Sequence, residues 1–465
     1  MASPPVVAPP SSFFGLIGLA SVDITPPVGI YARNWGAAPH DVATSIHRPL
    51  TLNVLTLRES PESLPLILIE ADLGFWKEQT LLEQLLSQVM ADHQVPRSRI
   101  LFSLTHTHAG PRMVDAIEEV EGGEFLQDWT VQTQKSARSA VQSAIDSAVP
   151  SLLEWHYGSC QLASNRDLVD PDSEHSRRIC GYAPGTAADA TLLVGRVSSQ
   201  EGALRALVVN YACHPTTLAF ENQALSPDFV GAMREVIQQV CGEQTIPFFL
   251  QGASGELAPR HQYVGDPSVA DRHGRQLAYA ALSTMEDMEP PGTVLRFQGV
   301  VESGAPLAIW KPTRYAPETT LQVQELTVEL ELKDLPTSAE IQAELDACDD
   351  RMLTERLRRK LDVRKKLGEG TTFRMPVHGW QIGSAMLIAT MSEAYSLMQI
   401  ELRRQFPENH VICLNITNGW IGYLAPQSLY DEDIYQVWQS PFARGGLERI
   451  IEGACGVLQE LTTDD

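Results

Sequence analysis

Short apolar runs alternate with longer amphipathic stretches along most of the 465-residue chain. The runs that predict strands are 66–69, 100–104, 192–197, 206–211, 246–250, 384–389 and 410–416. The stretches with helical periodicity are 80–92, 128–148, 228–241, 269–285 and 395–406. Continuous apolar strands separated by amphipathic helices are typical of sheets that are covered on both faces. We therefore predict an α/β fold in which covered mixed sheets are flanked by helices.

The N-terminal region predicts a first strand that follows a disordered tail. Residues 1–12 are rich in proline and serine, and the apolar piece 13–20 contains two glycines and leads into Asp23. The first cation is Arg33, whereas a secretory signal carries basic residues before its apolar core. No apolar run reaches the roughly 20 residues of a membrane-spanning helix. We expect a cytoplasmic protein without a transmembrane segment.

The stretch 317–370 has a different pattern. Residues 321–333, LQVQELTVELELK, alternate with period two, as in a half-exposed strand. A highly charged sequence follows, which starts at a Ser/Thr cap and stops at a glycine. It predicts a long surface helix or helical arm, with a lid or an oligomer contact as the functional alternative. Because we find no repeat and no linker, we interpret residues 13–465 as one domain with this helical insertion.

Composition excludes several classes of function. The net charge of −23 argues against nucleic acid or an anionic membrane surface as the main partner, because both are polyanions. The seven cysteines are scattered and show no CxxC spacing. We therefore expect neither a disulfide framework nor a cysteine zinc site. The same pattern predicts a protein of a reducing compartment.

Several predicted strands end in residues that do chemistry. These ends carry Thr105-His106-Thr107-His108, His214, the segment 252–256, Glu393 and Tyr423. In α/β proteins, ligands bind beyond the carboxyl ends of the strands, so ends that are distant in sequence converge there. We predict the active site at this edge.

The segment SLTHTHAGPR (103–112) raises a specific question. On a strand, alternation places His106 and His108 on one face, which makes a metal site plausible because zinc takes His nitrogens and carboxylate oxygens. Both histidines could hold a metal, they could divide between metal and substrate, or they could end a buried strand. Spacing alone favours His106, His108 and His214 as three ligands, with Glu393 as a base.

Seven segments together resemble the neutral ceramidase family, zinc amidohydrolases that split the N-acyl bond of sphingolipids. They occur in the family's order and are SVDITPPVG (21–29), THTHAGP (105–111), ASNRD (163–167), NYACHPTT (210–217), QGASGELAP (251–259), MSEAYS (391–396) and GYLAPQSLYDEDIYQ (422–436). The resemblance implies a zinc-dependent hydrolase of linear amide bonds in lipid metabolism. Its implied partner is a small N-acyl amide or lipid substrate.

The resemblance also reassigns the histidines. It implies that zinc is held by His106, His214, Glu393 and Tyr423. It places the other site residues at the substrate amide, namely His108, Arg166 and Tyr435. A metal-activated water then attacks, so no nucleophilic side chain is required.

The chain departs from the family at several positions. Ala258 stands where the family has serine, Glu256 where it has aspartate, and Ser392 where it has glycine. The chain ends soon after Tyr435, so we expect no C-terminal immunoglobulin-like domain. Two other interpretations stay open: the same zinc site could hydrolyse a soluble amide or ester, or the protein could bind metal without catalysis. The oligomeric state is not predicted.

Overall fold

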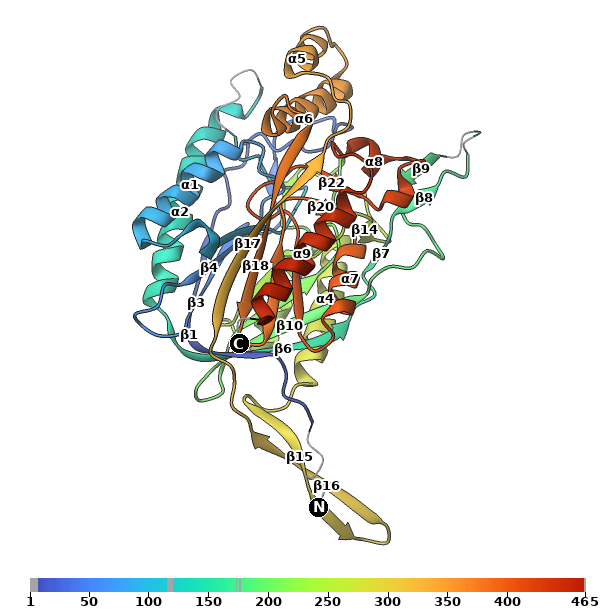
Figure 1. Cartoon of the computed structure of the whole chain (residues 1–465). Coiled ribbons are helices and arrows are strands. Elements are labelled where there is room, and N and C mark those ends of the chain that lie inside the picture. The colour runs from blue at the N-terminus through green and yellow to red at the C-terminus, as the bar shows by residue number, and fades with distance from the viewer. Residues whose placement is uncertain (1–6, 115–119, 173, 175–176, 464–465) are drawn as a thin grey trace.

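Two sheets form the centre of the molecule in a computed structural model that describes residues 7–114, 120–172, 174 and 177–463 (Figure 1). The larger has, in spatial order, β13 (Ile246–Gln251), β11 (Leu204–Tyr211), β10 (Thr191–Ser199), β6 (Val149–Ser159), β1 (Ser12–Asp23), β3 (Thr51–Arg58), β4 (Leu66–Ala71) and β5 (Ile100–Leu104). The smaller has β17 (Leu321–Glu331), β18 (Thr372–Ile382), β19 (Ala385–Ala389) and β21 (Val411–Leu414). Both are mixed, because β4–β5, β11–β13 and β19–β21 are parallel pairs among antiparallel ones.

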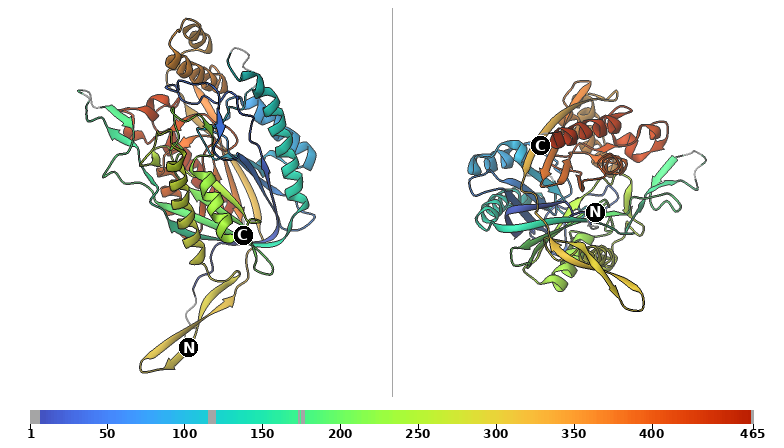
Figure 2. Two further views of the ribbon diagram at one scale, coloured as in Figure 1. Left: turned by 180° about the vertical axis from the view of Figure 1, so that it is seen from behind. Right: turned by 60° about the horizontal axis from the view of Figure 1, so that its bottom comes forward.

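The sheets pack face to face and helices cover their outer faces (Figures 1 and 2). Alternate side chains of each strand fill the layer between the sheets, including Phe13, Leu55 and Trp380. The helices on the larger sheet are α1 (Gln79–His93), α2 (Leu126–Asp146), α3 (Phe229–Cys241) and α4 (Pro267–Glu286), and those on the smaller sheet are α7 (Leu397–Gln405) and α9 (Gly446–Thr463). Burial on both faces explains the continuous apolar runs in the sequence. The predicted α/β fold with covered mixed sheets is confirmed.

Short ladders of two or three strands lie outside the two central sheets. They use β2 (Ser45–Ile46), β7 (Ala163–Asn165), β8 (Asp167–Val169), β9 (Arg177–Cys180), β12 (Ala224–Leu225), β14 (Leu257–Pro259), β20 (Glu393–Ala394), β22 (Tyr423–Leu424) and β23 (Asp433–Ile434), which leads into α8 (Tyr435–Gln439). The segment after β21 joins the two edges of the larger sheet, because Asn415 N–H donates to Gln251 and Asn418 N–H donates to Phe102. The ends of β5, β13 and β21 therefore converge.

The segment 317–370 differs from its prediction. Its strand, β17, pairs along its full length with β18 and belongs to the smaller sheet. The prediction of a single long helix was wrong, because the structure has two helices, α5 (Ser338–Asp346) and α6 (Arg351–Leu367). The Asp350 carboxylate accepts hydrogen bonds from the N–H groups of Met352 and Leu353 and so caps a new helix. One face of α6 is buried, so it is not a free surface arm.

Residues 1–6 lie outside the described part, but Ser11 and Ser12 are buried and β1 starts at Ser12, so the tail prediction was wrong at its end.

The strands β15 (Thr293–Glu302) and β16 (Pro306–Arg314) form a separate hairpin that projects from the body (Figure 1). The helices of the described residues include none long and apolar enough to cross a membrane.

Candidate active site

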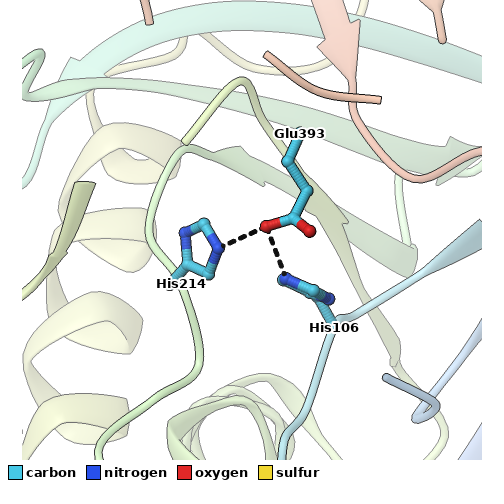
Figure 3. A group of neighbouring side chains, drawn as sticks. All are labelled: His106, His214 and Glu393. Atoms are coloured by element: carbon cyan, nitrogen blue, oxygen red, sulfur yellow. Dashed lines mark hydrogen bonds and ion pairs between the residues drawn. The ribbon is translucent and has the colours of Figure 1, made fainter. Parts of the chain in front are cut away.

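Two histidines and a glutamate meet beyond the carboxyl ends of the central strands (Figure 3). His106 follows β5, His214 follows β11, and Glu393 opens β20. Nε2 of His214 lies 2.9 Å from Oε2 of Glu393, and Nε2 of His106 lies 3.4 Å from the same oxygen. All three side chains are buried, and their donor atoms lie within 4.8 Å of one another.

Backbone carbonyls orient both imidazole rings. Nδ1 of His106 lies 2.8 Å from the Gly74 carbonyl oxygen, and Nδ1 of His214 lies 2.7 Å from that of Ser254. Because a carbonyl only accepts, each Nδ1 carries the proton and each Nε2 keeps its lone pair. This second hydrogen bond is the usual support of a metal-binding histidine. Both lone pairs are turned toward one carboxylate oxygen, as a shared cation requires.

The backbone at His106 bends the chain sharply. β5 ends at Leu104, and His106 has a φ of 70°, a left-handed conformation that non-glycine residues rarely adopt and that is enriched at functional sites. The predicted strand alternation over residues 105–108 was therefore wrong. The His106 and His108 rings are nevertheless neighbours, with centroids 4.7 Å apart, because this turn folds them together.

Tyr423 reaches the site through a short parallel ladder. It is the register partner of Glu393 in β20–β22, and Glu393 N–H donates to the Gly422 carbonyl at 2.9 Å. Burial and the Glu393 carboxylate raise the pKa of the Tyr423 hydroxyl well above its ordinary value. The phenol therefore keeps its proton in the protein alone, and a cation bound beside it would favour the phenolate.

Arg166 contacts the predicted ligands directly. Its guanidinium is fixed by the Gly255 carbonyl, which accepts from Nε at 3.2 Å and from NH2 at 2.7 Å. The same NH2 group lies 3.1 Å from the Tyr423 hydroxyl and 3.3 Å from Nε2 of His214. The buried cation thus compensates for the Glu393 carboxylate and can donate to an oxygen that gains negative charge.

His108 and Tyr435 complete the predicted set. Nε2 of His108 is buried and forms no hydrogen bond with a described residue. Burial, together with the neighbouring His106 and His214, lowers the pKa of His108 well below its ordinary value, so its ring is neutral at neutral pH. The ring of Tyr435 lies 5.7 Å from that of Tyr423. The structure therefore brings all seven predicted residues into one region.

Three further side chains were not predicted from the sequence. Trp420 donates its indole N–H to Oε1 of Glu393 at 2.7 Å. The Phe75 ring packs against His106 and His108, with centroids 4.9 and 5.1 Å away. The Arg359 guanidinium of α6 lies 5.7 Å from the Phe75 ring. The only sequence signal was the position of Trp420 three residues before Tyr423.

The donor set suits a divalent cation. Burial, and then the nearby Arg166, lower the pKa of His214 to about 3. Its Nε2 therefore carries a lone pair that can bind a metal at neutral pH. Two imidazoles and one carboxylate, with a tyrosine oxygen beside them, are the kinds of donor that catalytic zinc takes. Nε2 of His106 forms no hydrogen bond with a described residue, although it is buried. A cation would satisfy that atom.

Comparison with solved structures identifies the fold. No family model matches the chain, and no curated protein matches it in sequence. A structure described as a ceramidase complexed with C2 has a TM-score of 0.69, is 14% identical, and matches over 97% of this chain and 75% of that one. The neutral ceramidase of Pseudomonas aeruginosa has a TM-score of 0.68, is 16% identical, and matches over 98% and 75%. The chain has the neutral ceramidase fold.

The ceramidase fold agrees with the resemblance seen in the ordered motifs of the sequence. His106, His214 and Glu393 meet beyond the strand ends of this fold, where the sequence predicted the active site. The arrangement combines a candidate metal site, a neutral histidine whose buried Nε2 forms no hydrogen bond with a described residue, and a buried guanidinium. These are the components that hydrolysis of an amide requires.

Proposed function

We propose that the protein is a zinc-dependent amidohydrolase that cleaves the N-acyl amide of ceramide or of a related N-acyl lipid. The observation that carries the proposal is the orientation of His106 and His214, whose Nε2 atoms face one oxygen of Glu393. The ceramidase fold supports it, because the solved relatives are described as ceramidases. His106, His214, Glu393 and Tyr423 would hold the metal.

Zinc at this site would supply an activated water and polarise the amide carbonyl. His108 is placed to take a proton and to return it to the leaving amine, because its buried Nε2 has no other described partner. Arg166 and Tyr435 would donate hydrogen bonds to the carbonyl oxygen as it gains charge. Phe75 and Trp35 pack on the His108 ring, with centroids 5.1 and 5.2 Å away, and would hold it in position.

Metal analysis combined with a panel of N-acyl substrates tests this proposal. The wild-type protein should contain about one zinc per chain and release fatty acid from ceramide, with loss of activity on chelation and recovery on addition of zinc. His214→Ala should contain no zinc. His156→Ala is a matched control, because His156 pairs with Asp287 at the surface outside the site. Full hydrolysis by metal-free protein, or none by zinc-loaded protein on any N-acyl amide, would contradict the proposal.

A further inference from the structure

Helix α6 concentrates positive charge in a strongly acidic protein. Eight of its 17 residues are lysine or arginine and two are acidic, in a chain with a net charge of −23. A local cationic surface attracts anions even when the protein as a whole repels them.

Some of these cations form ion pairs or hydrogen bonds with neighbouring residues, whereas two cations that line a nearby cavity form no ion pair with a described residue. The partnered ones are Arg351 with Asp41, Arg359 with Glu355, Arg364 with Glu369, and Lys366 with the carbonyls of Trp76 and Trp420. Arg356 and Lys360 form no ion pair with any residue of the described ranges. The Arg356 guanidinium lies 4.4 Å from the Trp438 ring, so it is held in place without being neutralised.

A cavity of about 220 Å³ lies between α6 and residues 438–441. Arg356, Arg359 and Lys360 line it, and Glu344 is the one acidic side chain in this lining. Ile341 of α5, leucines of α6 and the Trp438 ring supply apolar walls. The cavity is therefore suited to an amphiphile whose polar end is negatively charged.

The cavity adjoins the candidate active site. Arg359 lines the cavity and also lies over the Phe75 ring, which packs against His108. On the other wall, the Trp438 ring lies 5.1 Å from that of Tyr435. Nε of Arg359 is buried and has no hydrogen-bond partner among the described residues. Arg359 thus lies both in the lining of the cavity and beside the predicted catalytic groups.

We propose that this cavity binds a carboxylate on the amide substrate, so that the substrate is an anionic N-acyl amide such as an N-acylated amino acid. This inference rests on the proposed function and narrows its substrate class. Guanidinium groups pair with carboxylates in charge-assisted hydrogen bonds, and Arg359 offers an unused N–H beside the site.

A matched pair of substrates tests it. N-dodecanoylglycine and N-dodecanoylglycinamide share the scissile amide and the chain, and only the first is anionic. The wild-type protein should show a higher kcat/KM for N-dodecanoylglycine, and the preference should weaken as salt rises. Arg356→Gln and Lys360→Gln should each lower that preference about 10-fold. Lys365→Gln is the control, because Lys365 is exposed on α6 and does not line the cavity.

Binding measured without turnover separates this inference from the proposed function. Calorimetry on chelator-treated wild-type protein should show that N-dodecanoylglycine binds more tightly than its glycinamide analogue. Tighter binding without hydrolysis after zinc is restored would refute the amidase and leave the cavity assignment standing. Equal binding of the two compounds, or an equal loss of preference in Lys365→Gln, would overturn the cavity assignment.

Discussion

Trp420 donates its indole N–H to Oε1 of Glu393 at 2.7 Å, which leaves Oε2 to face His106 and His214. The hydrogen bond fixes the rotation of the carboxylate. Trp420 is itself fixed, because its carbonyl accepts a hydrogen bond from Lys366 of α6. Helix α6 supplies no predicted ligand, but through Trp420 it supports the orientation of Glu393.

Trp420→Phe should weaken zinc binding by about 10–100-fold, the usual effect of removing a partner of a metal ligand. Phenylalanine keeps a six-membered aromatic ring but removes the five-membered ring with the N–H that holds Oε1. Competition with a chelating dye measures the affinity. Trp310→Phe, in the projecting hairpin, is the control. The same zinc affinity in both variants would show that the indole does not orient Glu393.

Ser254→Ala should keep kcat within about 10-fold of wild type, because Ser254 is not a nucleophile. Its hydroxyl lies 3.2 Å from Nδ1 of His214, but that nitrogen donates its proton to the Ser254 carbonyl and cannot act as a base. Rapid quenching and intact-mass analysis with an N-acyl substrate check this. A mass increase equal to the acyl group, absent in the Ala variant, would contradict it.

Asp228→Asn should gain stability relative to wild type as the pH rises. Asp228 is buried at the start of α3, where its carboxylate accepts from the N–H groups of Leu218 and Phe229. Burial raises its pKa from 3.8 to about 6. Because the folded state binds more protons than the unfolded state in this window, ionisation of the wild-type carboxyl lowers stability as pH rises through it.

The Asn variant loses one acceptor, and that loss is the same at every pH. The free energy of unfolding of Asp228→Asn minus that of wild type should therefore rise by roughly 2 kcal/mol between pH 4 and pH 7. Urea denaturation at the two values measures it. A difference that stays constant would mean that Asp228 has an ordinary pKa in the folded protein.

Much of the fold could be predicted because it depends on burial along the chain. Residues buried on both faces of a strand leave an apolar run, and β5 has the predicted bounds. The break between α5 and α6 was missed because it depends on one local cap at Asp350. The hairpin β15–β16 was missed because its exposed strands leave little periodic signal.

The place of the candidate site could be predicted, but its geometry could not. Donor residues at the strand ends indicated where it forms, and the roles that the ordered motifs imply for individual side chains stay predictions. The positive φ of His106 and the pairing of Glu393 with Tyr423 depend on contacts between distant segments. The contribution of Trp420 depends on a side-chain direction that periodicity does not encode.

The central claim is that His106 and His108 divide the work between metal and substrate. Zinc content and kcat measured side by side on His106→Ala and His108→Ala test it most directly. His106→Ala should lose both zinc and activity, because it removes an Nε2 that faces Glu393. His108→Ala should retain zinc while kcat falls by about 10²–10⁴-fold, the usual effect of losing a positioned acid–base group. Equal loss of zinc in both variants would contradict the account and make His108 a ligand.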